Sequence, residues 1–379
     1  MIRTLAVAGY RSIAGLVVGL DRLTVVTGPN GSGKTNLYRS LALLADAARG
    51  GVVPALAREG GLASTLWAGP REAVDGRPGP ALLRLGFGSD DFGYALDLGV
   101  PRAGTSMFTL DPEVRREVLW HGPILRPAAT LVDRTNTVVR VRDGGDWQML
   151  PQQVPLRDCL LAELSDPQHA PEVFAVRRRV ASWRFYDQVR TDADSPARRP
   201  AVATRTTAVA ADGHDLAPAV QTILEEGSAA APLHEALDQA FGAEAEVLDV
   251  GGRMELRLHL RGLMRPLSAG ELSDGTLRFV VWAAALLSPA PPQLLVLNEP
   301  ETSLHPSLIA PLAGLVAAAV QRTQVVVVTH SDALVAALDE RMRGTGLGVN
   351  EIRLAKRGGR TTVDGVGLLE GPPWTWPKR

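Results

Sequence analysis

The sequence has a single cysteine, Cys159, among its 379 residues. One thiol forms neither an intrachain disulfide nor a cysteine metal site, which excludes a disulfide-stabilised scaffold and favours a reducing compartment. Long apolar runs are missing too, since the longest, Phe279–Leu287, is far shorter than the roughly 20 residues that span a bilayer. No apolar secretory segment follows Met1. We therefore expect a cytoplasmic protein with no membrane partner.

Neither sign of charge is in excess, because 40 basic residues stand against 41 acidic ones. This balance gives no global basic field of the kind that predicts binding to nucleic acids or anionic membranes. Lysine is scarce, and only three of the basic residues are lysines: Lys34, Lys356 and Lys378. The hydrophobic fraction of 45% is typical of a globular chain with a sizeable core.

What is present near the start is a phosphate-binding pattern. Residues 28–35 read Gly-Pro-Asn-Gly-Ser-Gly-Lys-Thr, between an apolar run, Leu23–Thr27, and a helix-forming run, Asn36–Ala47. This is G-x-x-x-x-G-K-[ST] in its required strand–loop–helix setting, where glycines let backbone N–H groups surround a phosphate. We expect Lys34 to reach the β- and γ-phosphates and the Thr35 hydroxyl to bind Mg²⁺. A chance glycine-rich turn is the alternative, and the rarity of lysine argues against it.

The remaining pattern predicts an α/β fold with a nucleotide-binding core and two further parts. The core is a mixed or parallel sheet flanked by helices, and it is expected to be discontinuous, from residues 1–50 and 262–379. Alternating segments with turn residues between them predict an antiparallel β lobe over 51–155. Helical periodicity predominates over 156–262, which we interpret as a helical insertion. We expect the core and these two parts to form a single folded unit that spans the whole chain.

Two late runs, Leu294–Leu297 and Val325–Val328, are apolar throughout and predict parallel strands covered on both faces. The segment between them has a helical pattern, which completes a βαβ unit. Glu299 follows the first strand closely and His330 follows the second. Ligands bind beyond the carboxyl ends of such strands, so we expect Lys34 to meet both residues there.

Asn298 and Glu299 stand where nucleotide hydrolases carry a Walker B pair, which holds Mg²⁺ and polarises the attacking water. An acidic residue is usual at the first position, and Asn298 offers an amide oxygen without charge, which predicts weaker Mg²⁺ binding or slower turnover. His330 is a candidate donor to the γ-phosphate. A surface carboxylate and a structural histidine are the alternatives, and the P-loop favours function.

A second anion-binding helix start is predicted at Leu272–Thr276, where a serine hydroxyl and a glycine open the helical run Leu277–Leu287. An ordinary Ser/Asp helix cap would satisfy the same residues and is the better interpretation of this segment alone. The order of the other motifs around it favours the functional interpretation.

These motifs together resemble the ABC-type ATPase heads of the SMC/RecF-like branch, and more closely the compact bacterial AAA-family ATPases with overcoming-lysogenization-defect-like heads. The resemblance covers residues 1–50 and 262–340. It is carried by Tyr10-Arg11-Ser12, Gly28–Thr35, Leu272–Thr276, Asn298–Glu301, Leu304-His305-Pro306 and Thr329-His330-Ser331.

The resemblance implies a role for each matching residue. Lys34, Glu299 and His330 would be catalytic, and Thr35 and Asn298 would hold the metal. Glu301–Pro306 would take the place of the D-loop at a dimer interface. The nucleotide-binding residues would be Arg11, Gly28, Pro29, Asn30, Gly31, Ser32, Gly33, Lys34, Thr35, Asn36, Ser273, Gly275 and Thr276.

The same resemblance implies two ATP molecules held between two heads in an ATP-dependent homodimer. Mg²⁺-dependent ATP hydrolysis would then drive a nucleic-acid or partner transaction in genome maintenance or antiphage defence, with a nuclease as one candidate partner. A nucleotide switch that hardly hydrolyses ATP is an alternative because of Asn298. The resemblance also makes Leu272–Thr276 the signature segment, and a transporter subunit is disfavoured because this segment lies far from the P-loop. An arginine cluster is a candidate partner surface, although a solvated helix face explains it better: Arg177, Arg178, Arg179, Arg184 and Arg190.

Overall fold

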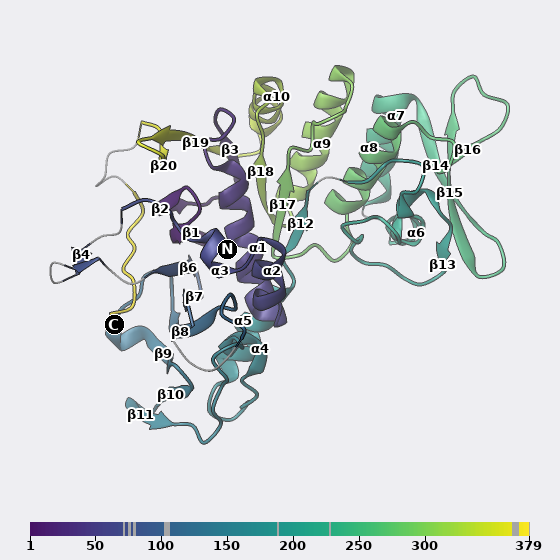
Figure 1. The fold of residues 1–379 in the computed structure, drawn as a ribbon. Helices are drawn as coiled ribbons and strands as arrows, with labels where there is room; N and C mark the ends of the chain where they lie inside the picture. The colour runs from purple at the N-terminus through teal and green to yellow at the C-terminus, as the bar shows by residue number, and fades with distance from the viewer. Residues whose placement is uncertain are drawn as a thin grey trace. The chain divides into compact units, whose positions relative to one another are not determined.

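The structure is a computed structural model, and it describes residues 1–70, 73–74, 77–78, 81–101, 107–187, 189–226, 229–365 and 371–378. The chain forms two compact units (Figure 1). The first comprises Met1–Asp21, Val26–Trp183 and Glu351–Arg379, and the second comprises Arg22–Val25 and Arg184–Asn350. Strand β3 (Leu23–Thr27) therefore contributes to both.

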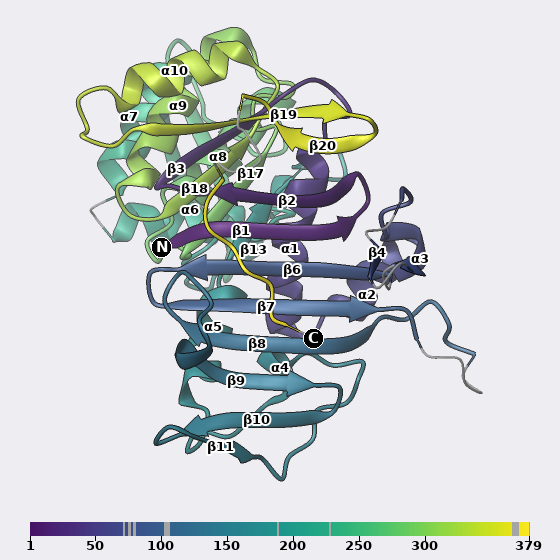
Figure 2. The same cartoon turned by 90° about the vertical axis from the view of Figure 1, so that its left-hand side faces the viewer.

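The first unit is built on an eight-stranded sheet in which every neighbouring pair is antiparallel. Figure 2 shows these strands stacked from β2 to β11. Their order across the sheet is β11 (Asp146–Met149), β10 (Val138–Asp143), β9 (Thr130–Thr135), β8 (Glu113–His121), β7 (Phe92–Gly99), β6 (Leu82–Ser89), β1 (Ile2–Tyr10) and β2 (Ile13–Gly19). A separate short pair joins β4 (Ala73–Val74) to β5 (Arg77–Pro78).

The longest helix of this unit, α1 (Lys34–Arg49), begins directly after the predicted phosphate-binding loop. Its leucines and alanines recur at helical spacing and are buried, and it contacts β1, β6 and the neighbouring helices. It ends at Gly50, whose φ of 76° is the left-handed conformation that commonly terminates helices. The other helical segments are α2 (Val52–Arg58), α3 (Leu62–Thr65), η1 (Pro127–Ala129), α4 (Leu160–Glu163) and α5 (Pro171–Ala181).

A buried ion pair ties the sheet of the first unit to the segment that leads into α4. Glu117 of β8 and Arg134 of β9 are both fully buried, and their charged atoms are 2.5 Å apart. Arg134 also donates to backbone carbonyls at Val154, Pro155 and Asp158. Every charge in this cluster thus has a partner, which is the condition for burying it.

The last described residues of the chain, 371–378, cross the face of the same sheet (Figure 2). The ring of Trp374 packs edge-on against Trp120, with ring centres 5.7 Å apart. A Cβ at Gly86 would lie 2.5 Å from the Trp374 ring, so a glycine is required beneath it. Arg84 stacks on Trp376 at 4.5 Å.

The second unit contains the parallel strands predicted late in the sequence. Strand β17 (Leu294–Asn298) pairs in parallel with β12 (Arg184–Tyr186) and with β18 (Gln324–Val328), and the sheet continues from β18 to β3. Helices flank these strands (Figure 1): α8 (Asp274–Leu286), α9 (Ile309–Val320) after the turn η3 (Pro306–Leu308), and α10 (Asp332–Met342). The strands are buried on both faces, as their unbroken apolar sequences predict.

A smaller antiparallel sheet completes the second unit. Its strands are β13 (Ala201–Val202), β14 (Ala243–Asp249), β15 (Arg253–Leu260) and β16 (Leu267–Ser268). Helices α6 (Leu216–Glu225) and α7 (Ala230–Phe241) pack on it, and the turn η2 (Pro196–Arg198) precedes β13. The helical pattern predicted over this region is confirmed for α6 and α7.

Several boundaries differ from those expected. A strand at Ile13–Gly19 was not predicted, and residues 113–121 and 130–135 were not recognised as β8 and β9. The compact units also divide the chain elsewhere than the predicted core and lobes, because α4 and α5 pack with α1 in the first unit. Near its C-terminal end the chain forms an antiparallel hairpin of β19 (Val349–Arg357) and β20 (Arg360–Val363).

Candidate functional site

The phosphate-binding loop lies in the first unit, between β3 and α1. Gly28, Gly31 and Gly33 have φ values of 138°, 77° and 109°, which residues with a side chain rarely adopt. Gly33 immediately precedes the first turn of α1, whose free N–H groups and positive dipole end favour an anion. The loop therefore has the backbone that a phosphate cradle requires.

Two of these glycines are also required by close packing. A Cβ at Gly28 would lie 2.2 Å from the carbonyl oxygen of Leu354 in β19, and one at Gly33 would lie 2.1 Å from Thr361 Oγ1 in β20. Thr361 Oγ1 donates to the carbonyl of Ser32 at 2.8 Å, and it lies 2.7 Å from Ser12 Oγ. The hairpin β19–β20 thus fixes the loop.

Lys34 is 6% exposed and folds back over the loop. Its Nζ donates to the carbonyls of Gly28 at 2.6 Å and Pro29 at 3.3 Å. The hydroxyl of Ser32 is buried and has no hydrogen-bond partner among the described residues. An orphaned donor beside a lysine at a helix start fits an anionic oxygen as the missing partner.

The other residues predicted around this loop differ in their surroundings. Thr35 is exposed on the first turn of α1, where its hydroxyl is open to a ligand. Pro29 and Asn30 are exposed as well. Asn36 instead donates to Ser12 Oγ at 2.8 Å, so its amide is engaged in fixing the turn between β1 and β2.

Arg11, predicted to touch phosphate, forms an ion pair in this structure. Its guanidinium donates to Glu59 Oε2 at 2.6 and 3.0 Å, and the Tyr10 hydroxyl donates to the same carboxylate at 2.8 Å. Burial raises the pKa of the Tyr10 hydroxyl, and the charge of Glu59 adds to the effect. A phosphate would compete with Glu59 for Arg11, and the phosphate contact stays a prediction.

In the second unit, the carboxyl ends of three parallel strands bring functional groups together. Glu299 follows β17 with a φ of 48°, and its backbone N–H donates to the carbonyl of Val328 at 2.7 Å. A left-handed glutamate is strained, and such strain concentrates at functional sites. Asn298 Nδ2 donates to Asp187 Oδ1 at 2.8 Å, just beyond the end of β12.

His330 follows β18 and lies beside two carboxylates. Its Nδ1 is 3.6 Å from Glu299 Oε1 and 3.6 Å from Glu301 Oε1. Glu301 is 8% exposed, and its Oε1 accepts hydrogen bonds from the Thr329 hydroxyl and, at 3.3 Å, from the His330 backbone N–H. The carboxylate of Glu301 points inward and supports the loop that carries His330. The D-loop position that the resemblance implies for Glu301 stays a prediction.

The predicted signature segment opens helix α8. Ser273 is the N-cap, and its Oγ accepts from the Thr276 backbone N–H at 3.2 Å, as the capping interpretation requires. Ser273 and Asp274 are exposed. Arg198 donates to the carbonyl of Leu272 at 2.8 Å and pairs with Asp274 at 2.7 Å, which holds the segment in place. Sequence reasoning missed Arg198, which stands in a loop without a motif.

Arg278 connects this helix to the loop after Glu299. It donates to the carbonyl of Thr302 at 2.6 Å, and the backbone of Ser303 has a φ of 64°. Helix α8 and the loop that follows Glu299 are therefore joined directly.

The oxygen groups present fit a magnesium ion held with a nucleotide. Asn298 Oδ1 is buried and lacks a hydrogen-bond partner in the described part of the chain. Within the described residues, no cluster of three His, Cys, Asp or Glu side chains could hold a metal by itself. Mg²⁺ is commonly bound through one or two side chains together with phosphates and water. The Thr35 hydroxyl in the first unit and the Asn298 amide in the second are each a hard oxygen ligand of that kind.

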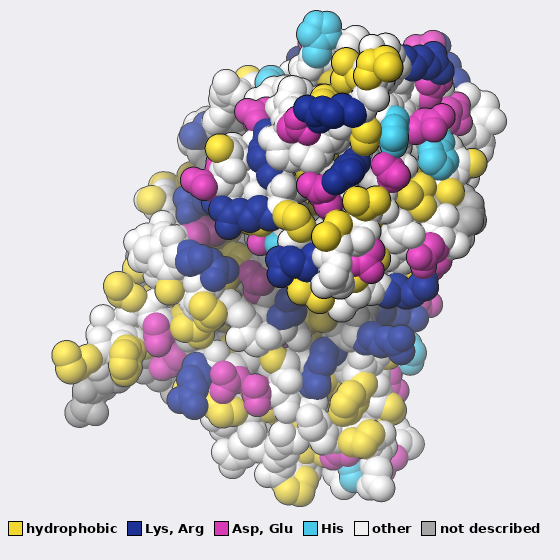
Figure 3. Space-filling view, turned by 90° about the vertical axis from the view of Figure 1, so that its right-hand side faces the viewer, with side chains coloured by type: hydrophobic (Ala, Val, Ile, Leu, Met, Phe, Trp, Pro, Cys, Tyr) yellow, Lys and Arg dark blue, Asp and Glu magenta, His cyan; other side chains and the backbone are white. Residues whose placement is uncertain are grey.

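The predicted arginine cluster is largely occupied within its own chain. Arg177 donates to carbonyls of Leu161 and Leu164, Arg179 pairs with Asp91 and Arg190 pairs with Asp192. Basic and acidic side chains are interspersed over the face shown in Figure 3. A solvated helix face therefore remains a better interpretation of these arginines than a partner surface.

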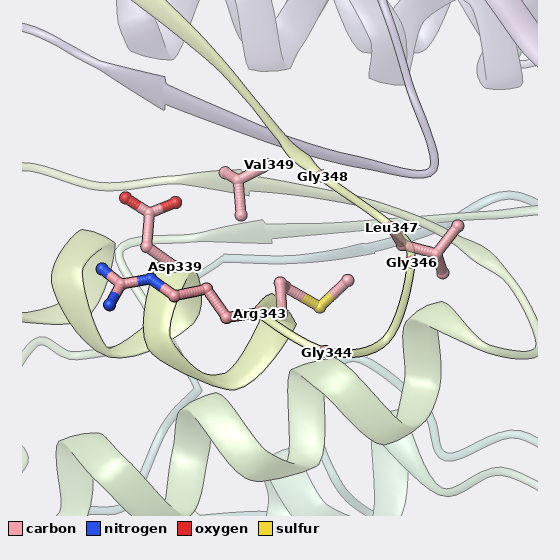
Figure 4. Close-up of a pocket in the computed structure, with 8 residues that line it drawn as sticks. Asp339, Arg343, Gly344, Gly346, Leu347, Gly348 and Val349 are labelled. Atoms are coloured by element: carbon pink, nitrogen blue, oxygen red, sulfur yellow. The ribbon is translucent and has the colours of Figure 1, made fainter.

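A pocket of about 440 Å³ lies in the second unit, where α10 ends and the chain turns toward β19. Asp339 lies on the last turn of α10 and Arg343 directly follows the helix beside it, with Val349 across from them (Figure 4). None of the predicted site residues lines it. No helix in the described ranges has the length and apolar character needed to cross a membrane.

Comparisons with known proteins show the family of the chain and its fold. The family model described as "AAA domain, putative AbiEii toxin, Type IV TA system" matches residues 23–142 and 164–336. No curated protein matches the chain.

Solved structures share the fold at low sequence identity. An Smc head bound to the C-winged helix domain of ScpA superposes with a TM-score of 0.52 at 13% identity, over 97% of this chain and 98% of that chain. An Smc head with an extended coiled coil, bound to the C-terminal domain of ScpA and derived from Pyrococcus furiosus, gives 0.54 at 12% identity, over 96% and 95%. The predicted AAA family is confirmed by the family model, and the fold of the chain is similar to that of these Smc heads, as predicted.

Proposed function

Since the chain belongs to the family of AAA domains described as putative AbiEii toxin of type IV toxin–antitoxin systems, we propose that it binds ATP and hydrolyses it with Mg²⁺. The family and the fold support ATP binding and hydrolysis in general. The assignment of steps to individual residues is our proposal.

The observation that carries it is the group of side chains at the parallel strand ends of the second unit. Glu299 and His330 lie 3.6 Å apart, although 31 positions separate them, and both stand directly beyond buried strands. Strand ends of this kind are where α/β proteins bind ligands. The strained backbone of Glu299 is difficult to explain as an ordinary surface feature.

We assign the following roles. Lys34 and the loop of residues 28–35, through the backbone N–H groups of all its residues except Pro29, bind the triphosphate, and Thr35 and Asn298 hold the metal ion. Bound Mg²⁺ supplies positive charge that stabilises the transferring phosphoryl group. Glu299 orients and polarises the attacking water, and His330 donates a hydrogen bond to the γ-phosphate.

We further propose that two heads dimerise around ATP. The exposed Ser273 and the start of α8 offer a hydroxyl and free backbone N–H groups to a phosphate bound by a second copy. Arg278 joins this surface to the loop that follows Glu299, so that dimerisation and hydrolysis can influence one another. The description of the family as a toxin–antitoxin component favours antiphage defence, with a nuclease or a nucleic acid as the candidate partner.

The test compares ATP turnover, ATP binding and molar mass in solution. We expect Glu299→Gln to bind ATP as the wild type does, to lose at least 10²-fold in turnover, and to form a dimer with ATP and Mg²⁺ by light scattering. Lys34→Ala is the matched control, because it should bind no ATP and remain monomeric. Wild-type protein that binds no ATP would refute the proposal. If Glu299→Gln is a strict monomer both with and without ATP and Mg²⁺, the proposed dimer is refuted.

A nucleotide switch with little hydrolysis is the second candidate, and Asn298 is the observation that favours it. If the wild type and Glu299→Gln bind ATP equally and are equally inert, the switch is correct and Glu299 is not catalytic.

A further inference from the structure

We propose that Asp187 supplies the negative charge that the Walker B position lacks, so that Asp187 and Asn298 together bind the waters of the Mg²⁺ ion. This inference rests on the proposed function and concerns the metal side of the same site. Sequence reasoning gave Asp187 no role, since it stands 111 positions from Asn298.

The register of the parallel sheet places Asp187 beside Asn298. Strand β12 pairs with β17 so that Tyr186 lies opposite Leu297. The next residue on each strand is therefore Asp187 on one side and Asn298 on the other. Both leave the sheet at the carboxyl edge, which also carries Glu299 and His330. A carboxylate thus occupies the same edge as the asparagine, on the neighbouring strand.

The hydrogen bond between the two residues determines how the asparagine is oriented. Asp187 Oδ1 accepts from Asn298 Nδ2 at 2.8 Å. A carboxylate can only accept, so the amide nitrogen must face Asp187 and the amide oxygen must face the other way. That oxygen is the buried Oδ1 without a partner in the described part of the chain. Its free lone pairs are available to a metal-bound water.

The charge of Asp187 is not neutralised by its neighbours. The side chain is exposed, and no ion pair to it is found among the described residues, whereas the nearby Arg190 is paired with Asp192. The asparagine occupies one oxygen of Asp187 and leaves the other lone pairs free. An unpaired carboxylate next to an unpaired amide oxygen offers two oxygen acceptors for the water molecules that a bound Mg²⁺ ion keeps.

A purely structural role is the competing explanation, because the same hydrogen bond also fastens β12 to β17. The two explanations differ in what the charge does. If the bond is only structural, loss of the Asp187 charge should change nucleotide affinity equally with and without Mg²⁺. If Asp187 acts on the metal, its loss should lower nucleotide affinity only when Mg²⁺ is present.

The experiment measures the affinity for AMP-PNP by calorimetry, in Mg²⁺ and in EDTA, for matched variants. We expect Mg²⁺ to strengthen binding in the wild type, and Asp187→Asn to lose about 10-fold or more of that strengthening while its affinity in EDTA is unchanged. The exchanged pair Asp187→Asn with Asn298→Asp restores the charge and should recover the Mg²⁺ effect. Asp194→Asn removes another exposed carboxylate of the same unit and should change nothing.

The outcomes separate the two proposals. Wild-type protein that binds no AMP-PNP in either condition would overturn the proposed function itself. Binding that is insensitive to Mg²⁺ in the wild type, or an undiminished Mg²⁺ effect in Asp187→Asn, would overturn the role of Asp187 alone. A loss of affinity in EDTA as large as in Mg²⁺ would show that Asp187 acts structurally.

Discussion

Gly31 and Gly33 stand two positions apart in the same loop, yet alanine should be far more costly at position 33. Both glycines have positive φ, so alanine at either site strains the backbone by about 1–2 kcal/mol. A Cβ at Gly31 would meet no atom within 4 Å, whereas one at Gly33 would lie 2.1 Å from Thr361 Oγ1 and 2.9 Å from its Cγ2. Thr361 cannot rotate away without losing its bond to the Ser32 carbonyl.

Overpacking of this kind typically adds about 1–3 kcal/mol, so Gly33→Ala should lower the free energy of unfolding by roughly 2–5 kcal/mol. Gly31→Ala should cost only the backbone strain, about 1–2 kcal/mol. Urea unfolding followed by circular dichroism measures both values. Thr361→Ala combined with Gly33→Ala should be less destabilising than the sum of the single changes. Equal unfolding midpoints for Gly31→Ala and Gly33→Ala would refute the reasoning.

Two further predictions concern charges outside the loop. Arg134→Met leaves Glu117 buried without its partner, so the free energy of unfolding should fall by about 3–5 kcal/mol in urea; a loss below 1 kcal/mol would contradict this account. Hydrogen bonds from Arg265, and then from the Ser268 backbone, lower the pKa of Glu271 from 4.5 to about 2. Its contribution to local stability is therefore complete above pH 4.5 and is lost as the pH falls toward 2. Hydrogen-exchange protection of residues 265–271 should fall across that window in the wild type but not in Glu271→Gln.

The sequence predicted the strand ends of the second unit because their signals are local. β17 and β18 are apolar throughout, and the residues after them belong to recognisable motifs. The P-loop was predicted for the same reason, because loop, lysine and helix are contiguous. A parallel βαβ unit then brings Glu299 and His330 together without further information.

The elements that were missed lack a local signal. The turn before β2 contains Arg11 and Ser12, without the Gly or Asn that marks tight hairpins, and Arg11 itself adopts a φ of 48°. β8 and β9 carry the buried Glu117 and Arg134, whose charges interrupt the apolar alternation by which strands are recognised. Asp187 follows a strand of three residues, and only the tertiary pairing of β12 with β17 shows what it adjoins.

The left-handed backbone at position 299 has a consequence for how this protein can change. Asparagine, aspartate and glycine adopt that conformation more readily than glutamate, so each of them would relieve a local cost of about 1–2 kcal/mol. Directed evolution for heat resistance alone would then be drawn toward replacing Glu299, while a screen for ATP turnover would restore it. If the two selections give opposite outcomes, Glu299 is a residue whose contribution to ATP turnover is kept at the expense of fold stability.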